Sequence, residues 1–273
     1  MLNLLSPALF TNHRGQGKAD GPSNRIWSLV KGELVSPDGQ KAARGAVSNY
    51  SSDLYNTTAS TAQASDGVNI FGDTGCGAVS QADGSGVLLT CTGSNLEANV
   101  ISGGNVAGIG TLSLDNVLAY EVAVTLTPAA TTNFGLIAGV IEPGSGGNSA
   151  IVDTTCLPKA STDYVGFNVK ADNSIVFVYQ KAAVGISTVS GVSQAITSGS
   201  TYKLGFVIDP NSSEERLKIY IDGVQKKALS KATLEADANW PDDTNFASIL
   251  GVKSIAGSAS TAKAAFMHCV QVA

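Results

Sequence analysis

The chain has 273 residues, of which 43% are hydrophobic and 14% are charged. This composition supplies a sizeable core for one large domain or two smaller ones, and it excludes a chain that is disordered as a whole. The net charge of −5, from 17 basic and 22 acidic residues, argues against a general binder of phosphate backbones, so we expect no nucleic-acid partner.

Charged residues fall below the usual share of about a quarter, while Gly, Ala, Ser and Thr are plentiful. Much of the surface must therefore carry small neutral side chains, which is unusual for a freely diffusing cytosolic enzyme. No window approaches the ~18 uninterrupted apolar residues of a membrane-spanning helix, so we expect no membrane partner. The apolar start has no basic region before it, and we expect no signal peptide.

Residues 1–65 differ in texture from the rest of the chain. They combine scattered basic residues, several Gly and Pro, and a small, polar run at 51–61 without a sustained period. Such a segment can hardly build its own core, which predicts an extended, mostly irregular N-terminal arm that docks on its own domain or on a neighbour. The candidate docking residues are Trp27, in a short amphipathic stretch, and the basic Arg14 and Arg25.

From residue 66 onward, the sequence is typical of β-strands separated by Gly, Asn, Asp and Ser clusters. In residues 120–126, apolar positions alternate with Glu121, Ala123 and Thr125, which predicts one dry face and one wet or thinly covered face. Residues 66–273 are therefore expected to form one β-sandwich domain. The predicted strands are 68–71, 86–92, 96–101, 118–126, 134–141, 164–170, 174–180, 201–208, 217–221 and 266–272.

Local signals place the turns and one short helix. Residues 169–176 predict a hairpin, because Asp and Asn tolerate turn geometry between two apolar runs. Asp222-Gly223 predicts a tight turn after the strand at 217–221. The best helical window is 230–237, where Ser230 is the candidate N-cap, and a single short helix fits an all-β fold.

The segment 201–224 resembles a strand pair of concanavalin A-like and laminin G-like jelly rolls. Here TYKLGFVID is followed by a polar gap at 211–216 and then by LKIYIDGV. In that group the second strand has the pattern apolar-x-apolar-Tyr-apolar-Asp-Gly. The resemblance covers residues 66–273 and implies an all-β, concanavalin A-like jelly-roll sandwich of two antiparallel sheets.

The small-residue composition and the arm also resemble tailed-bacteriophage virion proteins, in which jelly rolls serve as capsid decoration, cement or fibre modules. This resemblance implies a non-enzymatic structural protein on the virion capsid surface, made in the host cytoplasm. Its partners would be the major capsid protein or other virion subunits, and it would form a homo-oligomer. The alternative is a carbohydrate-binding, lectin-like or receptor-binding fibre module with glycans as partners.

The sequence carries no arrangement that favours an enzyme. Glycosidases of this fold would present a Glu-x-Asp-x-(x)-Glu strand with two carboxyl groups about 5 Å apart, and no such triplet occurs. The nearest acidic pair, Glu214-Glu215, predicts a solvated turn. No Gly-x-Ser-x-Gly elbow precedes a helix, and only His13 and His268 supply imidazoles. We expect no catalytic residues and no cofactor.

Calcium is the one metal that the sequence leaves open. Aspartates at predicted loops and strand ends offer the oxygen ligands that hard cations prefer, although no EF-hand spacing appears. The default alternative is that each of them is a turn residue. Asp242-Asp243 is the first pair to inspect. The full set is Asp153, Asp172, Asp209, Asp222, Asp242 and Asp243.

A sugar site would need an aromatic ring beside polar side chains. Trp240, Asn245 and Phe246 offer that mixture and are the candidate glycan contacts. The alternative is that Trp240 packs under its own loop, as large aromatic residues usually do.

The chain contains four cysteines and no C-x-x-C pair. Scattered buried thiols are therefore expected rather than a metal site. A Cys76–Cys91 disulfide stays open for a protein that matures in an oxidising space. The remaining thiols are Cys156 and Cys269.

Overall fold

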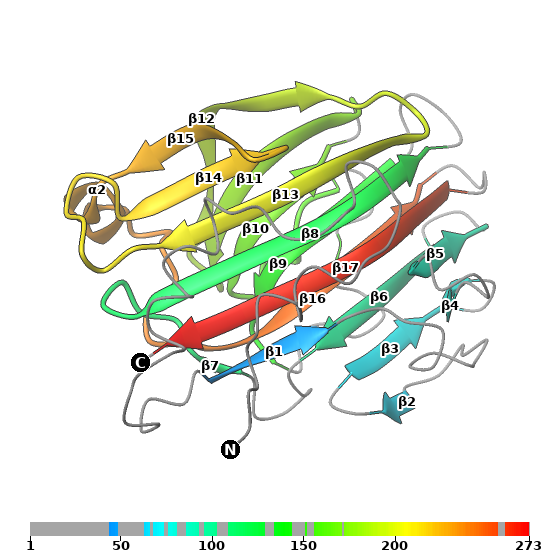
Figure 1. Ribbon diagram of the computed structural model, residues 1–273, viewed down its shortest axis with the longest axis horizontal. Helices are drawn as coiled ribbons and strands as arrows, with labels where there is room; N and C mark the ends of the chain where they lie inside the picture. The colour runs from blue at the N-terminus through cyan, green and yellow to red at the C-terminus, as the bar shows by residue number, and fades with distance from the viewer. Residues whose placement is uncertain are drawn as a thin grey trace, which may run out of the picture.

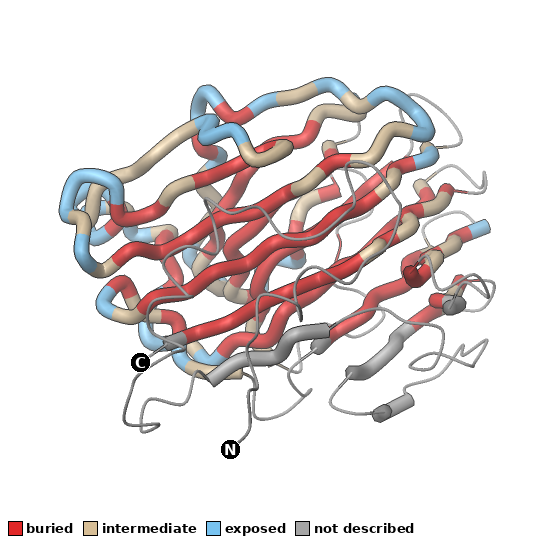
Figure 2. Tube along the Cα trace, in the orientation of Figure 1, coloured by how far each residue is buried: buried red, intermediate tan, exposed pale blue. Residues whose placement is uncertain are grey.

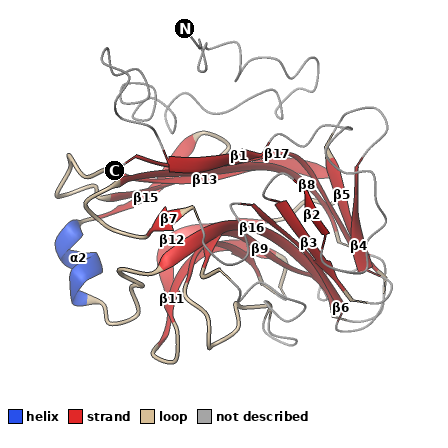
Figure 3. Cartoon of the chain, turned by 90° about the horizontal axis from the view of Figure 1, so that it is seen from below, coloured by secondary structure: helices blue, strands red, loops and turns tan. Residues whose placement is uncertain are grey.

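The computed structural model describes residues 44–48, 63–65, 68–73, 76–80, 86–92, 96–102, 109–128, 134–143, 151, 156–170, 172–255 and 260–272. They form two antiparallel β-sheets that lie face to face (Figure 1, Figure 3). The predicted jelly-roll sandwich is confirmed. No helix within the described ranges is long and apolar enough to cross a membrane.

Sheet A is the layer that carries the C-terminal strand. Its order is β15–β14–β13–β8–β17–β5–β4, and β1 pairs with β17 beside this path. The strands are β1 (Arg44–Ser48), β4 (Cys76–Ser80), β5 (Val87–Cys91), β8 (Val117–Thr127), β13 (Ser200–Ile208), β14 (Leu217–Ile221), β15 (Val224–Leu229) and β17 (Ser260–Val272).

Sheet B is the facing layer. Its order is β12–β11–β10–β9–β16–β6–β3–β2, and the short β7 pairs with β16. The strands are β2 (Gln63–Ser65), β3 (Val68–Gly72), β6 (Leu96–Ser102), β7 (Gly110–Thr111), β9 (Phe134–Ile141), β10 (Tyr164–Val169), β11 (Ser174–Lys181), β12 (Gly185–Ala195) and β16 (Asn245–Ser254).

The main core lies between the two sheets, and buried residues run along the central strands of both layers (Figure 2). Alternate side chains of β8 face it, as the period of two predicts. Phe206 of sheet A meets Phe177 of sheet B edge-on, with ring centroids 5.4 Å apart, and stacks on Tyr120 at 5.5 Å. The Tyr120 hydroxyl donates to the carbonyl of Ile249 across the sandwich at 3.1 Å. Aromatic contacts and a buried hydrogen bond therefore tie the layers together.

The predicted turns and the helix are present. Asp222 and Gly223 have φ values of 54° and 73°, the left-handed pair that a two-residue hairpin requires, and they join β14 to β15. Asn173, with φ of 58°, turns the hairpin between β10 and β11. Helix α2 (Lys231–Ala236) begins after Ser230, whose side chain accepts a hydrogen bond from the Thr233 amide. Its Leu234 is buried in the core, so the helix closes one end of the sandwich.

Two strands belong to the segment predicted as an N-terminal arm. Strand β1 pairs antiparallel with residues 267–271 of β17, and β2 pairs with residues 68–70 of β3. At least these parts of residues 1–65 therefore belong to the sheets. The proposed docking residues Trp27, Arg14 and Arg25 lie outside the described residues.

The outer face of sheet B is covered by residues of its own chain. The Asn168 side-chain amide donates to the carbonyl of Cys156 at 2.6 Å. The Gln180 amide donates to the carbonyls of Lys159 and Thr162 at 2.6 and 2.8 Å. Because Asn168 and Gln180 are buried, the segment 156–163 acts as a lid of backbone carbonyls over this face. A second apolar cluster that includes Ile137, Tyr164 and Ile249 packs on the same side.

Candidate functional site

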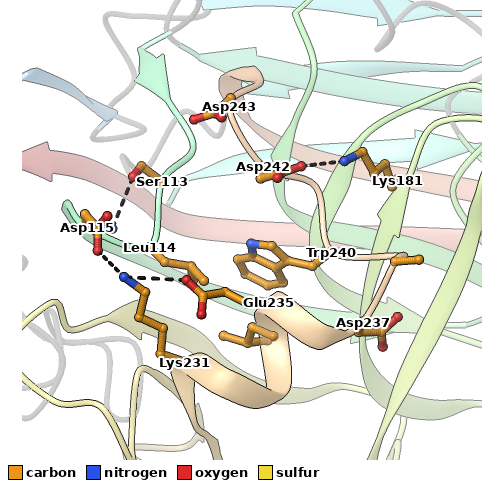
Figure 4. A pocket seen from close by; sticks show the side chains of 12 residues that line it. Ser113, Leu114, Asp115, Lys181, Lys231, Glu235, Asp237, Trp240, Asp242 and Asp243 are labelled. Carbon is orange, nitrogen blue, oxygen red and sulfur yellow. Dashed lines mark hydrogen bonds and ion pairs between the residues drawn. The ribbon is translucent and has the colours of Figure 1, made fainter.

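A pocket of about 430 Å³ opens at the end of the sandwich that α2 closes (Figure 4). We call it the end pocket. Its walls come from the loop before β8, the end of β11, helix α2 and the loop that leads to β16. Acidic side chains outnumber basic ones in the lining, so its field disfavours anions. The lining residues are Ser113, Leu114, Asp115, Lys181, Lys231, Leu234, Glu235, Asp237, Ala238, Trp240, Asp242 and Asp243.

Asp237 anchors the loop that follows α2. Its carboxylate accepts hydrogen bonds from the Tyr179 hydroxyl at 2.7 Å, the Ser187 hydroxyl at 2.7 Å and the Asn239 amide at 2.9 Å. Burial alone would raise the pKa of Asp237, but these hydrogen bonds outweigh it and hold the pKa below the usual range. Burial, helped by the hydrogen bond to Asp237, raises the pKa of Tyr179 to about 12. The loop is therefore fixed to strands β11 and β12.

Trp240 lies in the middle of the end pocket. Its side chain packs edge-on against Tyr179 with ring centroids 5.3 Å apart, and the residue is 4% exposed. The indole Nε1 is buried and finds no hydrogen-bond acceptor among the described residues. Figure 4 shows the indole nitrogen on the side of the ring that faces Ser113, Asp242 and Asp243. A buried N–H without a partner costs free energy, so this donor is suited to an acceptor that is not part of the described chain.

Two lysines neutralise part of the acidic rim. Lys181 binds Asp242 at 2.5 Å, and Lys231 binds Asp115 at 2.8 Å and Glu235 at 3.6 Å. The hydrogen bond from each lysine lowers the pKa of its aspartate, Asp242 or Asp115. These pairs are solvent-exposed, so each adds little stability and can open to admit a ligand.

Asp243 differs from the other acidic residues of the pocket. It adopts φ of 56°, and its amide donates to the Leu112 carbonyl at 3.0 Å. Within the described part of the chain, its carboxylate makes no hydrogen bond or ion pair. The pocket therefore presents a buried donor at Trp240 and an uncommitted acceptor at Asp243. A ligand with several hydroxyl groups, which can both accept and donate, matches this combination.

The predicted glycan contacts do not share one surface. Phe246 is 2% exposed and packs in the core, so its ring offers no face to a sugar. Asn245 is exposed and accepts a hydrogen bond from the Thr111 hydroxyl at 3.1 Å. Both residues begin β16, a strand that the sequence analysis did not predict. Trp240 alone of the three lines the end pocket, and its contact with a glycan stays a prediction.

The aspartates considered for calcium mostly shape turns. Asp172 accepts from the Ser174 amide at 2.9 Å, Asp209 from the Asn211 amide at 3.1 Å, and Asp222 from the Lys203 amide at 3.0 Å. Asp242 and Asp243 line the end pocket, and Asp153 lies outside the described residues. In the described ranges no group of three or more His, Cys, Asp or Glu side chains is arranged to hold a metal ion.

The cysteines are buried free thiols. Cys76 and Cys91 lie directly opposite each other on β4 and β5. A hydrogen bond with Cys76 and burial raise the pKa of the Cys91 thiol far above its usual value. The predicted buried thiols are confirmed, and the structure contains no disulfide between Cys76 and Cys91.

Sequence reasoning missed most of the pocket. Asp115, Lys181, Lys231 and Asp237 come from separate segments, and no motif joins them. The signal that was present was local: Trp240, Asp242 and Asp243 follow one another in a loop after the helix. The predicted solvated turn at Glu214-Glu215 is confirmed, since both residues are exposed turn residues.

No family model and no curated protein matches the sequence. Solved structures do match. The carbohydrate recognition domain of Emp47p has a TM-score of 0.55 over 82% of this chain and 96% of that domain, at 12% identity. The potassium-bound carbohydrate recognition domain of Emp46p has a TM-score of 0.54 over 81% and 95%, at 12% identity. A protein of unknown function, SO2946 from Shewanella oneidensis MR-1, has a TM-score of 0.52 over 90% and 92%, at 15% identity. At these identities the likeness shows the fold, a concanavalin A-like jelly-roll sandwich.

Proposed function

We propose that this chain is a non-enzymatic, lectin-like module that binds a hydroxyl-rich ligand, a glycan residue, in the end pocket. The observation that carries the proposal is the buried Trp240 Nε1, which has no acceptor in the described chain and lies among acidic side chains. The fold is compatible with this role, because the Emp46p and Emp47p domains that share it are carbohydrate recognition domains.

The chemistry of the pocket favours a sugar over a bare cation or an anion. An indole N–H donates and so repels a metal ion, while the excess of carboxylates repels phosphates and acidic sugars. A ligand hydroxyl that accepts from Nε1 would satisfy the indole, and another hydroxyl that donates to Asp243 would satisfy the carboxylate. Leu114, which is 9% exposed, lines the same pocket and offers apolar contact to a pyranose ring.

Trp240→Phe tests the proposal on a glycan array. Phe keeps an aromatic ring against Tyr179 but removes the N–H donor, so selective binding to one group of neutral glycans should fall at least tenfold. Asn245→Ala is the matched control, because Asn245 is exposed and lies outside the end pocket, and its binding should equal that of the parent. Silence of the parent chain across a broad array of neutral glycans would refute the proposal. Equal binding by Trp240→Phe and the parent chain would show that the indole N–H is not part of the glycan site.

A structural role in a phage virion is the second candidate. The observation that favours it is the pairing of β1 with β17, which fixes the N-terminal segment to the body and would let residues before Arg44 reach a neighbouring subunit. In this proposal the module is a homo-oligomer that docks on the capsid or another virion subunit and displays the sandwich. The basic Arg14 and Arg25 and the aromatic Trp27 remain its proposed docking residues.

Fractionation of phage particles tests this second role. The native protein should copurify with particles, and a chain that lacks residues 1–43 should fold and be left out of them. Removing only these residues keeps β1 in sheet A, so loss of incorporation would be due to docking and not to damage of the sheet. Absence of the full chain from particles, or full incorporation of the shortened chain, would contradict the role.

A further inference from the structure

A buried polar cluster lies on the outer face of sheet B, away from the end pocket. Glu97 and Asn99 are 0% exposed on β6, and Lys253 is 3% exposed on β16. Lys253 is the direct cross-strand partner of Glu97, and Gly251 is the partner of Asn99. The three polar side chains therefore occupy neighbouring positions on one face of two paired strands.

Glu97 contacts both of the other side chains. Its Oε1 accepts a hydrogen bond from Asn99 Nδ2 at 2.8 Å, and its Oε2 lies 3.5 Å from Lys253 Nζ. Gly251 makes room for this arrangement, since a Cβ at that position would lie within 3.2 Å of Asn99 Cγ. The Asn99 carboxamide therefore lies close to Gly251 of β16. Lys253, which carries the amine, is two residues further along the same strand.

Part of the cluster has a purely structural use. Lys253 Nζ donates to the Ile151 carbonyl at 3.0 Å, and Glu97 Oε2 accepts from the Ile151 amide at 3.2 Å. These bonds hold Ile151 against the outer face of sheet B and account for burying the ion pair. The Asn99 carboxamide takes no part in these bonds, although it donates to the same Glu97 carboxylate.

We propose that Lys253 and Asn99 become joined by an intramolecular isopeptide bond, with Glu97 as the proton-transfer group. A proton passes from the Lys253 ammonium to Glu97, leaving a neutral amine. The amine nitrogen attacks Asn99 Cγ, and the new C–N bond forms. The bond from Cγ to Nδ2 breaks as Nδ2 takes the proton that the amine nitrogen sheds. The ammonia takes the proton held by Glu97 and departs as ammonium, which restores the carboxylate.

The setting favours this reaction in two physical ways. The fold holds amine, carboxamide and carboxylate together, which replaces an encounter in solution by an intramolecular step. Burial excludes water that would compete with the amine for the Asn99 carboxamide carbon. The balance needs no oxidant and no further reactant. The product is a covalent link between neighbouring strands β6 and β16.

Intact-mass measurement of the purified, denatured full chain tests the proposal directly. The expected mass is lower than that of the sequence by one ammonia, and proteolysis should release a branched peptide that joins the segments of Asn99 and Lys253. A mass equal to that of the sequence would overturn the proposal. So would an ammonia loss in a linear peptide, as a succinimide at Asn173-Ser174 would give.

Two variants and one control assign the roles. Glu97→Gln keeps the hydrogen-bonding shape but cannot take the proton, and Lys253→Arg keeps the charge but lacks the amine, so both should have the mass of an uncrosslinked chain. Lys263→Arg on β17 is the matched control and should keep the branched peptide. A branched peptide in Glu97→Gln at the parent level would overturn the role of Glu97. If either variant fails to fold, the mass of the parent chain still decides the bond.

Discussion

At the scale of single residues, the carboxylates of the end pocket differ in how they are held. Some stabilise the fold, and others are available to a ligand. Asp237 accepts three hydrogen bonds from strands and loop, while Asp243 makes none with the described side chains. A carboxylate bound by several donors stabilises the fold, whereas an uncommitted one is available to a ligand. The two residues lie in one loop and can be compared directly.

Asp237→Asn should lower the free energy of unfolding by about 1–2 kcal/mol, because the amide replaces an acceptor for the Tyr179 and Ser187 hydroxyls. The pKa of Tyr179, about 12 in the parent, should fall because a negative neighbour is lost. Urea unfolding and an absorbance titration of the tyrosines measure the two effects. Asp243→Asn is the control and should unfold as the parent does. Equal stability of both variants would contradict the anchoring role of Asp237.

The stability difference between the parent and Asp237→Asn should also depend on pH. The pKa of Asp237 is lowered in the folded chain, so the folded state holds the proton less tightly than the unfolded state. Its stabilising contribution is therefore complete above the unfolded value of 3.8 and is lost as the pH falls through the lower folded value. The stability difference between parent and Asp237→Asn should be constant from about pH 5 to 7 and shrink below pH 4. A difference that grows on acidification would contradict this assignment.

At the scale of elements, the hairpin of β14 and β15 depends on one pair of backbone conformations. Gly223 has φ of 73°, where a side chain is strained, so Gly223→Ala should cost about 1 kcal/mol. Asp222→Asn should change stability by less than about 0.5 kcal/mol, because Asn tolerates φ of 54° and keeps an acceptor for the Lys203 amide. Chemical denaturation of both variants measures the difference. Equal costs would mean that the turn does not limit the hairpin.

The strands that sequence reasoning found are those with a clear period or an apolar run between turn residues. Strand β16 was missed because all residues from Phe246 to Ser254 are buried on both faces, so polar and apolar side chains do not alternate. Strand β12 was missed for the opposite reason: it is an edge strand with many exposed residues and few large apolar ones. A search for alternating polar and apolar residues assumes that one face of the strand is exposed and the other buried. It therefore detects neither β16 nor β12.

The candidate site was predictable only where it is local. Trp240 is a glycan candidate because an aromatic residue stands near polar Asn245 in the sequence, and Asp242-Asp243 is a calcium candidate because two carboxylates adjoin in a predicted loop. Asp115 and Lys181 reach the same pocket through the topology of the two sheets, which pairs segments far apart in the chain. Strand register and the packing of the two layers decide which distant residues come together. The amino-acid composition does not contain this information.

At the scale of the whole molecule, the outer face of sheet B is covered, whereas a pocket opens at one end of the sandwich. The outer face of sheet B is closed by the segment 156–163, which Asn168 and Gln180 hold through its carbonyls. The end pocket is lined instead by loops and by α2, where exposed ion pairs can rearrange. A rigid two-layer core with a polar pocket at its rim suits binding by loops on a fixed scaffold.

Strand β1 decides how the N-terminal segment joins this scaffold. Chains that begin at residue 44 and at residue 49 differ only in the strand that pairs with residues 267–271 of β17. Losing this ladder should lower the unfolding free energy by on the order of 2–4 kcal/mol, and the bared edge of β17 should promote association. Urea unfolding and size-exclusion chromatography of the two chains measure both effects. Since both lack residues 1–43, any role of those residues cancels, and identical behaviour of the two chains would contradict a stabilising role for β1.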